Sequence, residues 1–156
     1  MKKFGFITLL VVAVLGIGVV GAENITLGGG DCYGTYVVDV GAWQGIWTFS
    51  KDGTFQGTNS AEQVFDFSHQ QGAWTHSMDR NIRATWIDFT YDKRGNPTAF
   101  GRDDAELTFE NGCQYLKGTT DVRIYGLTED PLDPTGGSPV RDLQGVEITG
   151  QKLNPK

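Results

Sequence analysis

The side chains best suited to chemistry in this sequence are carboxylates. Asp103, Asp104 and Glu106 form an acidic run, and two such groups at a suitable separation can hydrolyse a glycosidic bond. A hairpin turn at residues 111–112 would turn Glu106 outward and Asp103 inward near the start of its strand. We therefore interpret the run as a solvated face and keep Asp103 alone as a candidate.

Asp88 is a second carboxylate of interest because it stands among aromatic and aliphatic residues. Its neighbours are Trp86, Ile87, Phe89 and Tyr91. Burial would raise its pKa and make it a candidate functional group. The other strand parity would leave Asp88 at the surface, and this is the interpretation that we favour.

The remaining polar residues give weaker signals. His69 and His76 lie in a polar, turn-like region, and a metal site would need more ligands with orienting partners. Asp130 and Asp133 match no EF-hand spacing, so the Asp-Pro pairs favour turns over Ca²⁺ binding. The chain has no Gly-x-Ser-x-Gly elbow and no Cys-x-x-Cys motif. The sequence therefore indicates no catalytic residue, no metal ligand and no cofactor.

Aromatic residues are the informative excess. They contribute large buried areas, so a packed core is the simplest interpretation. The functional interpretation is an aromatic-lined cavity with a few polar groups, which is the usual make-up of a small-ligand site. The residues concerned are Trp43, Trp47, Trp74, Trp86, Tyr36, Tyr115 and Tyr125.

The elements that position these residues are β-strands joined by tight turns. Residues 82–91 are rich in aromatic and β-branched side chains, and a charged turn at 92–96 ends them. We count eight or nine such strands and no convincing helical period. A sheet of that size hides its edges best by closing. The sequence therefore predicts an all-β fold, an antiparallel up-and-down meander barrel of about eight strands.

The Asn111-Gly112 pair predicts a type I′ hairpin with a two-residue loop. That loop pairs Leu107 with Leu116, Ala105 with Gly118, Glu106 with Lys117 and Arg102 with Asp121. Directly opposed residues share a face. The interior face then carries Leu107, Leu116, Ala105 and Val122, and the outer face carries Glu106, Lys117, Arg102 and Asp121.

The N-terminal residues predict a signal peptide. A basic start at residues 1–3 precedes an uncharged apolar run at 4–20, and small residues precede Glu23. An uncleaved anchor is the alternative, although the run is at the short edge for spanning a bilayer. We expect a signal peptide at residues 1–22 and a secreted or periplasmic mature protein that is not membrane-bound.

The mature chain would be a single β-barrel domain at residues 23–156, which contains an acidic loop rich in Pro and Gly at 126–139. Without Lys2 and Lys3 it would have 11 basic and 19 acidic residues, a net charge of −8. Nucleic-acid binding needs a basic footprint, so this charge argues against such a partner and against anionic membranes.

The chain contains two cysteines, Cys32 and Cys113. An exported protein usually oxidises such a pair, and two cysteines allow one bridge only. We therefore expect a disulfide between them, and two unrelated thiols are the alternative.

Gly34-Thr35-Tyr36, at the head of the first predicted strand, resembles the Gly-x-Trp signature of lipocalins and other calycin barrels, with Tyr in place of Trp. Arg123 lies in a late strand, where those barrels carry an Arg that packs across the signature aromatic. The order of Cys32, this motif and residues 53–58 is similar to avidin-type barrels. The whole chain resembles small exported calycin-like proteins of unassigned function. The resemblance implies a barrel with a cavity, and it implies no particular ligand.

The resemblance also suggests roles for two residues. Tyr36 would lie inside one end of the barrel, and Arg123 would stack across its ring, unless Arg123 points to solvent. The other end would then be the open mouth. We expect Trp47, Trp74 and Trp86 to line it, with the acidic loop near its rim.

We expect an exported barrel that binds a small, largely apolar ligand in an aromatic-lined cavity. The alternatives are a cyclase-type enzyme of the allene-oxide-cyclase or dirigent kind, which would use the same cavity, and a secreted interaction or inhibitor protein with a filled barrel. An inward carboxylate with a raised pKa would favour the enzyme, and an apolar cavity without one would favour the binder. The sequence favours a binder, and it indicates neither the ligand nor the oligomeric state.

Overall fold

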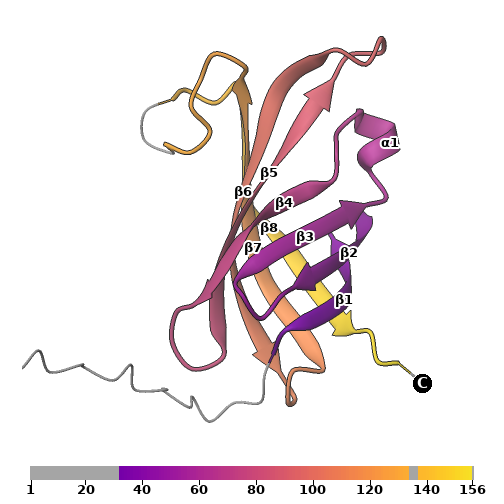
Figure 1. Cartoon of the computed structure of the whole chain (residues 1–156), viewed down its shortest axis with the longest axis vertical. Helices are drawn as coiled ribbons and strands as arrows, with labels where there is room; N and C mark the ends of the chain where they lie inside the picture. The colour runs from indigo at the N-terminus through magenta and orange to yellow at the C-terminus, as the bar shows by residue number, and fades with distance from the viewer. Residues whose placement is uncertain (1–31, 134–136, 156) are drawn as a thin grey trace, which may run out of the picture.

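The computed structural model describes residues 32–133 and 137–155, and within them eight strands form one closed barrel. Each strand pairs antiparallel with the next, and the last closes against the first (Figure 1). The strands are β1 (Gly34–Val40), β2 (Trp43–Phe49), β3 (Thr54–Asn59), β4 (Gln70–His76), β5 (Asn81–Tyr91), β6 (Pro97–Glu110), β7 (Tyr115–Gly126) and β8 (Arg141–Lys152), and a short helix, α1 (Glu62–Phe65), follows β3. This confirms the predicted all-β meander barrel.

The predicted signal peptide, residues 1–22, lies outside the described residues. In residues 32–133 and 137–155, no helix is long and apolar enough to cross a bilayer.

Alternation of side chains explains why these segments are strands. In β5, Ile82, Ala84 and Trp86 are buried, whereas Asn81 and Arg83 are exposed. Successive residues of a strand point to opposite faces, so one face of β5 fills the barrel and the other meets solvent.

The turn between β6 and β7 differs from the expected two-residue loop. Leu116 pairs with Phe109, not with Leu107, because the turn spans residues 111–114. Its first three residues, ending at Cys113, all have positive φ. The Asn-Gly pair therefore adopts the left-handed conformation that the sequence predicts, but Cys113 continues the turn and shifts the register by two residues.

A shift of two residues keeps every side chain on its predicted face, because the side-chain period of a strand is also two. The interior set is confirmed, since Ala105, Leu107 and Leu116 are buried and Val122 lines a cavity. The predicted cross-strand pairs are wrong, and Glu106 and Lys117 instead form ion pairs with Arg83 and Glu110, respectively.

We predict that Leu116→Ala lowers the free energy of unfolding by about 2–5 kcal/mol, because it leaves a void in the core. The Leu116 side chain is only 1% exposed. Lys117→Ala, its neighbour on the outer face, should cost less than about 1 kcal/mol, because its ion pair with Glu110 is exposed. Urea denaturation of both variants tests this, and equal losses would contradict the assigned faces.

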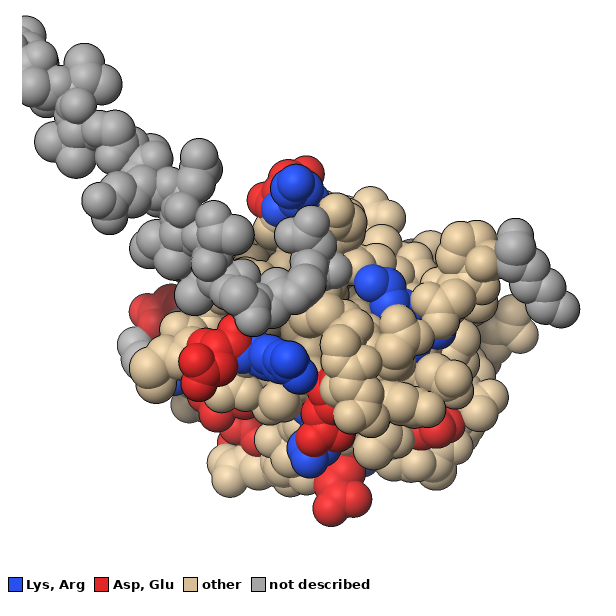
Figure 2. All heavy atoms as spheres, turned by 90° about the horizontal axis from the view of Figure 1, so that it is seen from below, with Lys and Arg blue, Asp and Glu red and all other residues tan. Residues whose placement is uncertain are grey.

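The end of the barrel near the start of β1 is closed by a buried aromatic cluster and a disulfide. The Tyr36 ring is fully buried, as predicted, against Phe49 and Phe109. Its hydroxyl donates to the carbonyl oxygens of Cys32, at 3.2 Å, and Cys113, at 2.9 Å. The predicted disulfide joins these two cysteines. Seen from this end, acidic and basic side chains are interspersed on the visible surface (Figure 2).

Arg123 does not stack on Tyr36, so that prediction is wrong. The residues on either side of Arg123 line the barrel cavity, and strand alternation therefore turns Arg123 to the outer face. There its Nη1 donates to Asp104 at 2.9 Å. Lys152 is the cation near Tyr36, with its Nζ 6.0 Å from the ring centre.

The described part of the acidic loop, residues 126–133 and 137–139, packs against the outside of the barrel. Arg102 on β6 donates from its Nη1 to the carbonyl of Pro131 at 2.7 Å. Gly137 lies against the ring of Tyr125, which is fully buried although it faces outward from β7. The loop leaves the barrel at the end opposite the disulfide (Figure 1).

Candidate functional site

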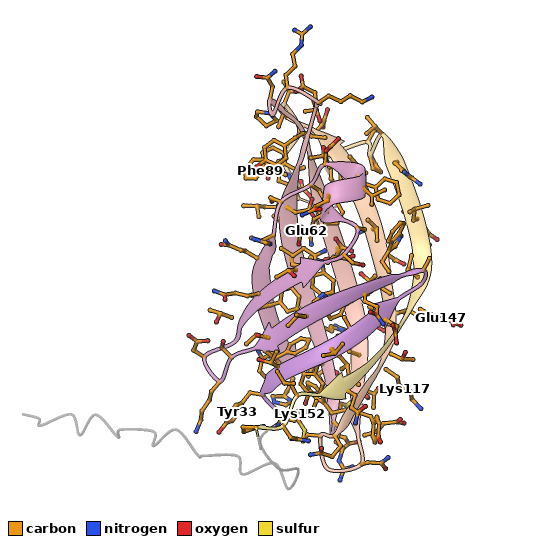
Figure 3. All side chains as sticks on the ribbon, turned by 90° about the vertical axis from the view of Figure 1, so that its right-hand side faces the viewer. Tyr33, Glu62, Phe89, Lys117, Glu147 and Lys152 are labelled. Carbon is orange, nitrogen blue, oxygen red and sulfur yellow. A yellow bond between two sulfur atoms is a disulfide. The ribbon has the colours of Figure 1, made fainter. Side chains whose placement is uncertain are left out.

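A cavity of about 540 Å³ occupies the barrel at the end opposite the disulfide, and all eight strands contribute to its wall. Small-ligand pockets commonly have volumes of roughly 300–1,000 Å³. The barrel is thus filled at one end and hollow at the other. Figure 3 shows the two ends, with Tyr33 and Lys152 at the closed end and Glu62 of α1 at the other.

The cavity wall is mostly apolar. Its aromatic members are Trp43, Trp47, Phe65 and Phe67, and its aliphatic members include Val40, Val122, Ile124, Leu143 and Val146. Trp43 and Trp47 lie on the same face of β2, so the alternation that selects Trp47 also identifies Trp43. Phe65 and Phe67 come from α1 and the segment after it, and no strand pattern indicates them.

Of the three tryptophans predicted to line the mouth, the structure places only Trp47 in the cavity wall. Trp86 lies behind it, with ring centres 4.8 Å apart, and stacks on Phe55. Trp74 lies toward the closed end, where it contacts Phe49 and its indole donates to the carbonyl of Ser50 at 2.9 Å. Tyr36 belongs to the closed end and Arg123 to the outer face, so neither lines the cavity.

Asp103 lies in the cavity wall and is 6% exposed, as the inward prediction for this residue requires. Burial raises the pKa of its carboxyl well above the usual value, and the charge of Asp88 adds to this rise. The polar groups of the nearby Trp86 and Thr120 side chains act in the opposite direction, because they favour the charged form of the carboxyl.

Asp88 also faces the cavity and is 7% exposed, so the surface interpretation is wrong. It shares the inner face of β5 with Trp86, because the two residues are two positions apart. Burial raises the pKa of Asp88 to about 6, although a hydrogen bond from the Gln70 side chain favours the charged form.

A glycine on the neighbouring strand makes room for this carboxyl group. Gly101 of β6 pairs directly with Asp88, and a Cβ atom there would lie 2.5 Å from Asp88 Oδ1. Any larger residue at position 101 would displace the carboxyl group.

Two further polar groups in the wall are buried without a hydrogen-bond partner in the described part of the chain. They are Oε1 of Gln70, an acceptor, and Nε1 of Trp47, a donor. Both side chains pack over Gly57, where a Cβ atom would lie 2.9 Å from Gln70 Oε1 and from Trp47 Cδ1. Buried polar groups are usually paired, so these two atoms mark places where a ligand can form hydrogen bonds.

The rim of the cavity is built by α1 and the first residues of β8. Glu62 accepts from the backbone N–H of Asn59 at 2.8 Å, and its Oε2 lies 3.0 Å from Nδ1 of His69. Arg141 lies at the rim with an exposed side chain. Within residues 32–133 and 137–155, no group of three or more His, Cys, Asp or Glu side chains is arranged to hold a metal ion.

The functional geometry therefore differs from the sequence prediction in its polar part. The cavity joins Asp88, Asp103 and Gln70 from β5, β6 and β4. Gln70 was not indicated by any sequence motif. Asp88 could have been placed in the cavity from its position two residues after Trp86, because such residues share a face of the strand.

Comparisons with known proteins identify no relative of this chain. No protein-family model matches it, and searches of curated proteins and of solved structures find no match. The closed eight-stranded antiparallel barrel and its cavity are therefore known from the structure and not from any relative.

Proposed function

We propose that this protein is a calycin-like barrel that binds a small, largely apolar ligand in its aromatic-lined cavity. The observation that carries the proposal is the cavity of about 540 Å³ at one end of an otherwise filled barrel. Such a site combines apolar walls with a few polar groups that orient the ligand. The aromatic part of the apolar wall consists of Trp43, Trp47, Phe65 and Phe67. The polar groups that would orient the ligand belong to Gln70, Asp88 and Asp103.

Export of the protein is part of the proposal. Both cysteines of the chain are joined in one disulfide, and disulfides persist mainly in oxidising compartments. The signal-like residues 1–22 support the same interpretation. A secreted or periplasmic barrel that collects a small molecule is the function that these features support together.

Native mass spectrometry of the exported protein tests for a bound molecule, which should add a discrete mass that denaturation removes. A neutral apolar probe, 1-bromooctane, tests the site itself, because a bromine atom quenches tryptophan fluorescence only near contact. Trp43 and Trp47 line the cavity and Trp74 does not, so we predict that the probe quenches tryptophan fluorescence in the wild type. Quenching should be largely lost when Trp43 and Trp47 are both replaced by phenylalanine, and it should persist in the control Trp74→Phe.

Quenching that is lost equally in the two variants would place the probe elsewhere. A cavity that takes up neither a cellular molecule nor the probe would overturn the proposed binding function.

A cyclase-type enzyme that uses the same cavity is the second candidate, and the inward carboxyl groups are what favour it. Asp88 has a pKa of about 6, which suits a group that gains and loses a proton near neutral pH. Incubation of the co-purified molecule with the protein in D₂O separates the two candidates. An enzyme that moves a proton to carbon would leave carbon-bound deuterium or a rearranged product, and a binder would return the molecule unchanged.

The third alternative is an interaction or inhibitor protein with a filled barrel. The cavity at one end of the barrel makes this alternative less favourable than ligand binding.

A further inference from the structure

The two carboxyl groups in the cavity have no cationic partner among residues 32–133 and 137–155. Neither Asp88 nor Asp103 takes part in an ion pair in the described part of the chain. By contrast, Asp104, which follows Asp103 and lies on the outer face of β6, forms ion pairs with Arg102 and Arg123. A buried carboxylate without a partner is costly, so buried charges are normally paired.

The polar groups of the wall are mainly acceptors when its two carboxyl groups are charged. Gln70 Oε1 lacks a hydrogen-bond partner in the described part of the chain, and Gln70 is 6% exposed. With the carboxyl groups of Asp88 and Asp103, which lack an ion-pair partner, it makes three acceptor groups. Among the described residues of the wall, the unpaired donor is Nε1 of Trp47. A ligand that satisfies this wall must supply hydrogen-bond donors.

We propose that the ligand carries a protonated amine, whose ammonium group binds between Asp88, Asp103 and Gln70 while its apolar body lies against Trp43 and Trp47. This inference rests on the proposed binding function. An ammonium group has three donors and no acceptor, which matches the three acceptor groups. Indole faces also attract cations. Two carboxylates and one amide oxygen fall short of the six to eight oxygen ligands that Ca²⁺ takes.

Proton release follows from this assignment. Before binding, burial favours the protonated form of both carboxyl groups. Two acidic neighbours act in the same direction, Glu62 on Asp88 and Asp104 on Asp103. The positively charged Arg141 lies at the rim of the cavity. When the ammonium group enters, a carboxyl O–H bond breaks and its proton passes to the buffer. The amine keeps all its protons, and no covalent bond to the ligand forms.

The test compares amines with alcohols of the same shape by isothermal titration calorimetry. The probes are 2-phenylethylamine, 2-(1-naphthyl)ethylamine and decylamine, each against the alcohol in which hydroxyl replaces the amino group. We expect the best amine to bind at least about tenfold more tightly than its alcohol near neutral pH. Titrations in buffers of different ionisation enthalpy should reveal proton release with the amine and none with the alcohol.

Matched variants locate the group responsible. Asp103→Asn and Asp88→Asn should each remove most of the preference for the amine and reduce proton release. Asp39→Asn, which removes a carboxylate from the exposed outer face of β1, should leave both unchanged. Wild-type proton release needs no variant, so the test holds even if a variant fails to fold.

Alcohols that bind as tightly as the amines would overturn the inference and leave the proposed binding function standing. Binding of the amines without proton release and without loss in either Asn variant would also overturn it. If no amine, no alcohol and no neutral apolar probe binds, both proposals fall.

Discussion

The variant in which Cys32 and Cys113 are both replaced by serine is expected to lose about 4 kcal/mol of unfolding free energy relative to the oxidised wild type. The disulfide joins residues 81 positions apart, so it restricts most of the described chain in the unfolded state. It also ties the segment before β1 to the β6–β7 turn, at the closed end of the barrel. Urea denaturation of the two proteins measures the loss.

Two controls separate the covalent bond from its surroundings. The reduced wild type should lose nearly as much stability as the double variant, since both lack the bond. Tyr36→Phe keeps the disulfide and removes the two hydrogen bonds from the Tyr36 hydroxyl, so it should cost only about 1–3 kcal/mol. A double variant within about 1 kcal/mol of wild type would contradict a stabilising role for the bridge.

Strand alternation predicts more of this fold than turn length does. The interior set of the β6–β7 hairpin is identified from the sequence although the predicted pairing is off by two residues. An error of two leaves the faces intact, and an error of one would have reversed them. Cys113 extends the turn, and its left-handed φ of 69° is unusual for a residue that is neither Gly nor Asn.

Two of the placement errors in the candidate site, those of Asp88 and Arg123, have one physical origin. The sequence prediction places Trp86 inside the barrel and Asp88 at the surface, although residues two apart on a strand share a face. It also places both Val122 and Arg123 inside, although adjacent residues point to opposite faces. In both cases the structure follows the alternation. A consistent parity along each strand would have identified both Asp88 and the outward Arg123.

The position of each inward side chain along the barrel axis could not be predicted from the sequence. Trp47, Trp74 and Trp86 all face inward, yet only Trp47 reaches the cavity. Their heights depend on how far each strand is displaced along its neighbours, which is a property of the closed barrel. Strand alternation does not predict Phe65 and Phe67 for another reason. They belong to α1 and the segment that follows it, and not to a strand.

The unliganded protein is expected to lose stability as the pH rises from about 4 to about 7, by about 2 kcal/mol through Asp88 alone. The pKa of Asp88 is about 6 in the folded protein, against an ordinary value of 3.8. A raised pKa means that the folded state binds the proton more tightly than the unfolded state does. Its contribution is therefore complete below the unfolded pKa and is lost as the pH passes the folded pKa.

Asp103 extends the loss to higher pH, because burial and the Asp88 charge raise its pKa well above the usual value. The two groups interact, so the pair is expected to titrate as a unit. Asp52 and Asp92 act in the opposite sense, since hydrogen bonds lower their pKa values in turns, and they weaken the protein only at acid pH.

Urea denaturation across this pH range measures the slope, and Asp88→Asn is the informative variant. It should flatten the pH dependence and be more stable than wild type near neutral pH, because an amide in this place has no charge to bury. Asp39→Asn should keep the wild-type slope, since that carboxylate is exposed. A wild-type stability that rises steadily between these pH values would show that neither carboxyl group is held in its neutral form.

A ligand changes this slope in a way that depends on its charge. A neutral ligand gains nothing from charged carboxyl groups, so the stability that it adds should not grow as the pH rises. An ammonium ligand binds the charged form of Asp88 and Asp103, so its stabilisation should grow as the pH rises and offset the loss seen without ligand. Stability curves with saturating 2-phenylethylamine and with saturating 2-phenylethanol should therefore diverge above about pH 6, where the unliganded protein begins to carry charge in its cavity.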